Sequence, residues 1–126
     1  MTDVAIQDQY IDLLQRSGEP QEVAEGETIF AEGDPADRMY VVSSGSVTLS
    51  IGERVVETVG PGGLFGEIAV VDREPRSGSA VAETDATLIA IDKRRFWFLV
   101  QETPYFAEIV MRVMANRLRR ETTPSA

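Results

Sequence analysis

Between residues 21 and 91 the chain alternates short runs of Val, Ile, Thr and Phe with clusters of turn-forming residues. Each run is long enough for one short strand, and each cluster is typical of a turn. Residues 47–51 and 54–59 are separated only by Gly52-Glu53, which is the spacing of a tight β-hairpin. Many short strands at regular spacing favour a small β-barrel or jelly roll. The other predicted strands are residues 28–31, 39–42, 79–82 and 87–91.

Helical patterns flank this region on both sides. Over residues 4–14, apolar side chains recur at helical spacing, and Ser17-Gly18-Glu19-Pro20 ends the helix. Beyond residue 91, Asp92 can cap one helix, and Pro104 suits the first position of another. The last helix carries an apolar stripe that either packs in the core or faces a partner: Phe106, Ile109, Val110, Val113, Met114 and Leu118.

The predicted fold is therefore α+β and mainly β. It is a double-stranded β-helix, or jelly-roll, barrel with an N-terminal helix and two C-terminal helices. The predicted boundaries are 4–14 for the first helix, 21–91 for the barrel and 92–120 for the C-terminal helices. A chain of 126 residues that is 43% hydrophobic fits one domain with a substantial core, so residues 1–126 are expected to form a single domain.

The composition excludes several classes of function. The chain has no cysteine, which excludes disulfides, zinc fingers and thiol nucleophiles. It has no histidine, which excludes a serine–histidine triad and removes the commonest metal ligand, so we expect neither catalysis nor a bound metal. No segment is apolar for long enough to span a membrane, and the N-terminus does not resemble a signal peptide. We therefore expect a cytoplasmic protein that does not insert into membranes.

The net charge of −9 argues against non-specific nucleic-acid binding, which requires a basic surface. The charge is unevenly distributed. Arg16 is the only basic residue among the first 37, whereas the last predicted helix carries Arg112, Arg117, Arg119 and Arg120. These arginines are either solvated cations that suit the C-terminal end of a helix or a basic face for a partner.

Two neighbouring segments contain the residue types that could hold a phosphorylated sugar. The first is Phe65-Gly66-Glu67-Ile68-Ala69 and the second is Pro75-Arg76-Ser77-Gly78-Ser79. Glu67 can accept hydrogen bonds from sugar hydroxyls, and the planar fork of Arg76 matches phosphate geometry. A helical turn after Gly66 would present its first amides to an anion. The alternative is a salt bridge between Glu67 and Arg76 across the loop.

These segments resemble the phosphate-binding cassette of cyclic nucleotide-binding domains, as in catabolite activator proteins and protein kinase A regulatory subunits. The family pattern is roughly Phe-Gly-Glu-Leu/Ile-Ala, a variable loop, and Pro-Arg-x-Ala/Gly-Ser/Thr. The resemblance covers about residues 10–120. Outside the cassette it rests on four further segments: Gly26-Glu27-Thr28-Ile29-Phe30, Glu32-Gly33-Asp34, Met39-Tyr40-Val41-Val42 and Ser44-Gly45-Ser46-Val47.

The resemblance implies a role for each residue of the cassette. Arg76 would bind the cyclic phosphate together with backbone amides near Ile68 and Ala69. Glu67 would accept a hydrogen bond from the ribose 2′-hydroxyl, and Ser77 would touch the phosphate or the base. Gly66 would permit close approach of the sugar. The remaining candidates are Gly78 in the cassette and the apolar walls around the base, which we assign to Val56, Leu64, Phe65 and Val81.

The implied function is that of a regulatory or sensor domain without catalysis, in which ligand binding repositions the C-terminal helices. We favour cAMP over cGMP because the family most often binds cAMP. A second copy or an effector protein would contact the last helix. Only a few residues follow Leu118, so direct DNA binding is not expected. The alternatives are a ligand-free interaction module of the same fold and a cupin-like enzyme, which the lack of histidine disfavours.

Overall fold

The computed structural model describes residues 8–122. Its first element is helix α1 (Asp8–Ser17), which confirms the predicted N-terminal helix from residue 8 onward and extends it by three residues. Residues 4–7 of that prediction lie outside the described residues. The strands and the short internal helix that follow are β1 (Glu19–Val23), β2 (Thr28–Phe30), β3 (Arg38–Ser44), β4 (Val47–Ile51), β5 (Arg54–Val59), β6 (Leu64–Phe65), α2 (Glu67–Asp72), β7 (Ser79–Ala82) and β8 (Ala86–Asp92).

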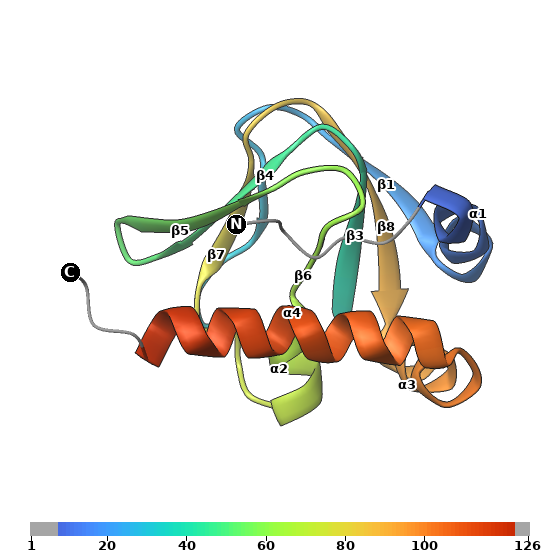
Figure 1. Cartoon of the computed structure of the whole chain (residues 1–126). Helices are drawn as coiled ribbons and strands as arrows, with labels where there is room; N and C mark the ends of the chain where they lie inside the picture. The colour runs from blue at the N-terminus through green and yellow to red at the C-terminus, as the bar shows by residue number, and fades with distance from the viewer. Residues whose placement is uncertain (1–7, 123–126) are drawn as a thin grey trace.

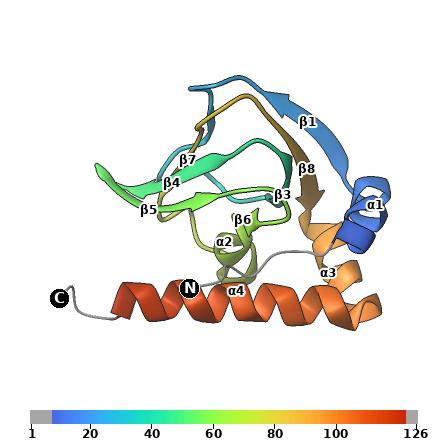
Figure 2. The same ribbon diagram turned by 45° about the horizontal axis from the view of Figure 1, so that its top comes forward.

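The strands form two four-stranded antiparallel sheets. One has the order β1-β8-β3-β6 and the other has the order β2-β7-β4-β5. Figures 1 and 2 show the strands curving around a common interior, with the last helix running beneath it. The mixed class of antiparallel sheets with flanking helices agrees with the prediction from sequence.

The hairpin predicted at Gly52-Glu53 is confirmed, since Ile51 pairs with Arg54. Two strands were not predicted. Strand β1 starts at Glu19, two residues before the predicted barrel, because Pro20 in the helix-ending signal also fits a strand at the edge of its sheet. Strand β6 has only two residues and follows a glycine-rich segment, so it is too short to show the alternation of apolar and polar residues that predicts a strand.

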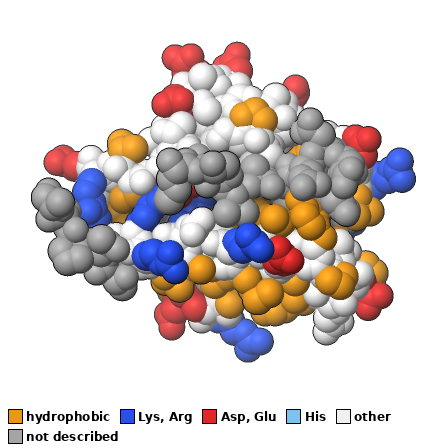
Figure 3. Space-filling model, viewed as in Figure 1, with side chains coloured by type: hydrophobic (Ala, Val, Ile, Leu, Met, Phe, Trp, Pro, Cys, Tyr) orange, Lys and Arg blue, Asp and Glu red, His pale blue; other side chains and the backbone are white. Residues whose placement is uncertain are grey.

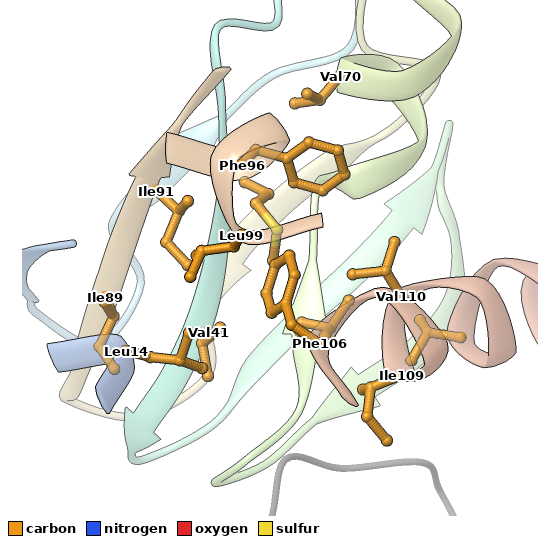
Figure 4. Close-up of a cluster of buried hydrophobic side chains, with 13 residues drawn as sticks. Leu14, Val41, Val70, Ile89, Ile91, Phe96, Leu99, Phe106, Ile109 and Val110 are labelled. Carbon is orange, nitrogen blue, oxygen red and sulfur yellow. The ribbon is translucent and has the colours of Figure 1, made fainter. Parts of the chain in front are cut away.

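Strands β3 and β8 are buried on both faces, and their side chains alternate between two cores. Met39 and Val41 point into a core shared with the helices, whereas Tyr40 and Val42 point into the barrel interior. Figure 4 shows the first core, where Ile91 of β8 lies beside Leu99 and Ile89 of β8 lies beside Leu14. This shared core fixes the helices against one sheet.

The C-terminal helices are α3 (Lys93–Glu102) and α4 (Pro104–Thr122). Asp92 caps α3 as predicted, because its Oδ1 accepts a hydrogen bond from the Arg95 N–H at 2.8 Å. Pro104 begins α4, also as predicted. Over the described residues, no helix combines the length and the apolar character needed to cross a membrane.

The apolar stripe of α4 is mainly core. Its members Phe106, Ile109, Val110 and Val113 are buried, and Met114 packs against them. The interpretation of this stripe as a partner surface is therefore wrong for these four residues, and only Leu118 is exposed. Figure 3 shows hydrophobic side chains gathered on the surface over α3 and α4. The exposed large hydrophobic residues of these helices include Phe98 and Met111, each 62% exposed.

Candidate functional site

A cavity of about 290 Å³ lies where the barrel meets the C-terminal half of α4. Its walls come from β4 and β5, from the start of α2, from the segment before β7 and from α4. Most of the wall is apolar, and the polar groups are concentrated in a few side chains. The lining residues are Phe30, Leu49, Ser50, Ile51, Arg54, Val55, Val56, Glu57, Gly66, Glu67, Ile68, Ala69, Arg76, Ser77, Gly78, Ser79, Arg117 and Arg120.

An irregularity in the β4–β5 pair shapes one wall. The register shifts between Leu49, which faces Glu57, and Ser50, which faces Val55. One extra residue on β5, Val56, is therefore inserted at this point, as in a β-bulge. Regular strands alternate between two faces, whereas four successive β5 residues, Arg54 to Glu57, line this cavity. The bulge thus turns Glu57 toward the cavity beside Val55 and Val56.

Gly66 forms the junction between β6 and α2 and has a φ of 83°. This left-handed conformation favours glycine. A Cβ atom at this position would also lie 2.8 Å from Arg76 Nη1. The first turn of α2 follows at once and has no side-chain cap. Gly66 therefore allows the Arg76 side chain to lie directly against the backbone at the start of α2.

Arg76 is a buried cation, and no carboxylate in the described part of the chain forms a salt bridge with it. Its Nη1 donates a hydrogen bond to the carbonyl oxygen of Gly66 at 2.7 Å, and its Nη2 donates to that of Arg38. The guanidinium lies 4.0 Å from the centre of the Phe30 ring. Burial lowers the pKa of Arg76, although the Coulombic influence of Tyr40, Asp37 and Glu67 opposes this effect. The site thus holds a positive charge whose solvation is incomplete.

Glu67 is also buried, with 1% of its surface exposed, but it has a partner. Its Oε1 accepts a hydrogen bond from Arg117 Nη1 at 2.6 Å. The predicted alternative, a salt bridge between Glu67 and Arg76, does not form. The carboxylate of Glu67 is instead tied to α4, fifty positions away in the sequence.

Arg117 joins three segments of the chain. Besides Glu67, it contacts both carboxylate oxygens of Glu57, at 2.9 and 3.1 Å, and the carbonyl oxygen of Leu64 at 2.7 Å. Glu57 also forms a salt bridge with Arg120 at 2.9 Å. Burial lowers the pKa of Arg117, but the two carboxylates outweigh this effect and hold that pKa above its ordinary value. In contrast to the charge of Arg76, the positive charge of Arg117 is balanced by the carboxylates of Glu57 and Glu67.

Two buried side-chain polar atoms in the described part of the chain have no hydrogen-bond partner, and both belong to residues that line this cavity. They are Oε2 of Glu67 and Nε of Arg76. Leaving a buried polar atom unpaired costs about 1–3 kcal/mol, and more for a charged group. One of these atoms is an acceptor and the other is a donor. A ligand with a hydroxyl and an anionic group could satisfy both.

Most of the predicted site residues line the cavity. They are Val56, Gly66, Glu67, Ile68, Ala69, Arg76, Ser77 and Gly78.

Three predicted site residues do not line the cavity. Leu64 points into the core shared with the helices, and Phe65 points into the barrel interior, where its ring stacks on Tyr40. Val81 lies on β7, where it pairs with Thr28 of β2 and Thr48 of β4, and it is also outside the lining.

One charged part of the site is not predicted from the sequence. Arg117 and Arg120 were assigned either to solvent or to a partner surface, but both line the cavity. Arg54 and Glu57 were included only as strand residues. The sequence does offer one indication that Glu57 belongs to the site, because it directly follows the predicted site residue Val56 on the same strand. The contacts of Arg117 have no such indication, because they depend on how α4 packs beneath the barrel.

A comparison with protein families identifies the family to which this chain belongs. The family model described as the cyclic nucleotide-binding domain matches residues 20–103. The chain belongs to the cyclic nucleotide-binding domain family. The resemblance noted in the sequence is thereby confirmed. The match includes both cassette segments and ends before α4, so it does not include Arg117.

Individual relatives agree with the family. The domain is 33% identical over 112 residues to the CRP-like cAMP-activated global transcriptional regulator of Mycobacterium tuberculosis, covering 85% of this chain and 50% of that protein. It is 40% identical over 84 residues to the cAMP-dependent protein kinase regulatory subunit of Eremothecium gossypii, covering 67% of this chain and 18% of that protein. The chain thus spans half or less of the length of these two relatives.

A solved structure with a similar fold is the catabolite activator protein of Thermus thermophilus. The TM-score is 0.79 at 33% sequence identity, and the similarity covers 91% of this chain and 56% of that one. Within residues 8–122, no group of three or more His, Cys, Asp or Glu side chains is arranged to hold a metal ion.

Proposed function

We propose that this domain binds a 3′,5′-cyclic nucleotide in the cavity and acts as a regulatory domain without catalysis. The observation that carries the proposal is the pair of unpartnered buried atoms, Oε2 of Glu67 and Nε of Arg76, in one cavity. A cyclic nucleotide has a ribose hydroxyl that can donate to the carboxylate and a phosphate that can accept from the guanidinium.

The charges around the cavity support an anionic ligand. Four arginines and two glutamates line it, which leaves two positive charges in excess within a chain of net charge −9. These residues are Arg54, Arg76, Arg117, Arg120, Glu57 and Glu67.

The assignment of ligand groups follows the geometry of the walls. In the proposed pose the phosphate lies beside Arg76, Ser77 and the first turn of α2, and the ribose lies against Glu67. The base lies against the apolar wall of β4 and β5. We favour cAMP over cGMP because the family most often binds cAMP and because both relatives described above carry cAMP in their names.

A route for regulation runs through Glu67. One oxygen of this carboxylate is free for the ligand, and the other is held by Arg117 of α4. A ligand that binds to Glu67 therefore changes the surroundings of the carboxylate that holds Arg117 of α4. A contact that differs between two positions of α4 is what a ligand needs in order to favour one of them. A partner protein or a second copy would then contact the outer side of α3 and α4, near Phe98 and Met111.

The test uses Glu67→Gln and a ligand without the 2′-hydroxyl. We expect the substitution to weaken binding of cAMP by about tenfold or more, because a hydrogen bond to a charged group contributes about 1.5–3 kcal/mol. Binding of 2′-deoxy-cAMP should change much less, because this ligand has no hydroxyl for Glu67. Calorimetric titration of both proteins with both nucleotides measures the four affinities.

Equal losses for the two nucleotides would contradict the role of Glu67. Absence of binding to the unmodified chain would reject the proposed function in favour of a ligand-free module. The matched control is Glu83→Gln, since Glu83 is exposed and does not line the cavity. It should leave all affinities unchanged.

A further inference from the structure

Glu57 is a second carboxylate at the cavity, and no residue role described above requires it. It lies on β5 at the irregular point of the β4–β5 pair, with 16% of its side chain exposed. It binds Arg117 through both oxygens and Arg120 through one. Glu57 is therefore the point at which the hairpin is attached to the C-terminal half of α4.

The donors of Arg117 are almost fully used. A guanidinium has five N–H groups. Nε and Nη2 each donate to Glu57, Nη2 also donates to the Leu64 carbonyl, and Nη1 donates to Glu67. Among the described residues, only one N–H of Arg117, on Nη1, has no hydrogen bond assigned to it. Arg117 contacts a single oxygen of Glu67, and the other oxygen has no hydrogen-bond partner within residues 8–122.

This division is not the arrangement that an isolated arginine and glutamate prefer. Two parallel hydrogen bonds to both carboxylate oxygens form the stronger, bidentate pair. In such a pair Arg117 would occupy Oε2 of Glu67. Glu57 opposes that pairing because its two oxygens occupy the side-on fork of Arg117, formed by Nε and Nη2. The other N–H of Nη2 donates to the Leu64 carbonyl, so the end-on fork beside Nη1 is also engaged.

We propose that Glu57 is a positioning residue for the ribose site, which it serves by keeping Oε2 of Glu67 free of Arg117. Glu57 does this without contacting the ribose itself. The inference rests on the proposed function, since it assigns Oε2 to the ribose 2′-hydroxyl. Removal of the Glu57 charge lets Arg117 turn toward Glu67 and compete with the ligand for that oxygen.

The test is the substitution Glu57→Gln, which keeps the size of the side chain and removes its charge. Calorimetric titrations of the whole chain with cAMP and with 2′-deoxy-cAMP give the result. We expect the affinity for cAMP to fall by about tenfold, which corresponds to 1.4 kcal/mol. The affinity for 2′-deoxy-cAMP should stay within about twofold of the unmodified chain, since this ligand does not use Oε2. Unchanged binding of this ligand also shows that the variant is folded.

The matched control is Glu53→Gln, the same chemical change on the turn of the same hairpin at an exposed residue outside the cavity lining. It should leave both affinities unchanged. Equal losses for both nucleotides in Glu57→Gln would overturn the inference, because a purely structural attachment of α4 affects both ligands alike. Unchanged affinity for cAMP would overturn it as well.

If Glu57→Gln does not fold, Glu57→Asp replaces it. The shorter carboxylate keeps the charge but reaches Arg117 less well, so we expect a smaller loss that is again confined to cAMP. A loss shared by both nucleotides overturns the inference here too. Failure of the proposed function is a separate result, because it appears as no binding of cAMP to the unmodified chain.

Discussion

Substitution of Arg76 by alanine is expected to weaken the binding of cAMP about 100-fold. Arg76 is buried and lines the cavity, and within residues 8–122 it has no carboxylate partner and its Nε has no hydrogen-bond partner. A hydrogen bond to a charged group contributes about 1.5–3 kcal/mol, and each 1.4 kcal/mol corresponds to a tenfold change in affinity. Loss of the Arg76 guanidinium is therefore expected to lower the affinity by about two orders of magnitude. Calorimetric titration measures the affinity, and a thermal melt checks that the variant is folded.

Two further variants separate charge from geometry. Arg76→Lys keeps the positive charge but loses the planar fork, so its affinity should lie between those of the unmodified chain and the alanine variant. Arg94→Ala removes an exposed cation of α3 that does not line the cavity, and it should bind normally. Binding of cAMP by a folded Arg76→Ala variant within a factor of about two of the unmodified chain would show that Arg76 does not hold the phosphate.

The second large effect concerns stability. Arg117→Ala is expected to lower the free energy of unfolding by about 3–5 kcal/mol, since breaking a buried ion pair leaves an uncompensated charge. Glu67 is 1% exposed and would lose its only hydrogen-bond donor among the described residues, and Glu57 would lose two contacts. Urea denaturation followed by circular dichroism measures this free energy.

Arg112→Ala is the matched control on the same helix. Arg112 is exposed and pairs with Glu108 one turn away, an arrangement that contributes about 0.3–0.5 kcal/mol. A loss of stability for Arg117→Ala as small as that of Arg112→Ala would mean that the Glu57–Arg117–Glu67 contacts do not support the fold. In high salt, the loss of unfolding free energy caused by Arg112→Ala should shrink by a larger fraction than the loss caused by Arg117→Ala. The reason is that salt screens an exposed ion pair more strongly than a buried one.

The part of the site that could be predicted from the sequence is the part that is contiguous in the sequence. Gly66, Glu67, Arg76 and Ser77 lie within two short motifs whose residue types already indicate their chemistry, and all four line the cavity. The hairpin and the Asp92 cap were predictable for the same reason, since each depends on residues only a few positions apart.

The remaining features depend on the direction of side chains and on contacts between distant segments. Leu64 and Phe65 are apolar and adjacent to the motif, but alternation along β6 sends one to each core and neither to the cavity. The bulge that places Glu57 in the lining has no sequence signal of its own. Arg117 reaches Glu67 only because the apolar stripe of α4 packs beneath the barrel, so its role follows from tertiary structure.

The central claim, that the cavity is a cyclic nucleotide site, is tested most directly by calorimetric titration of the unmodified chain with cAMP and with adenosine. We expect one cAMP to bind per chain and adenosine to bind much more weakly, because adenosine has no phosphate for Arg76. A chain that binds neither cAMP nor cGMP at millimolar concentration, or that binds adenosine as tightly as cAMP, would contradict this claim.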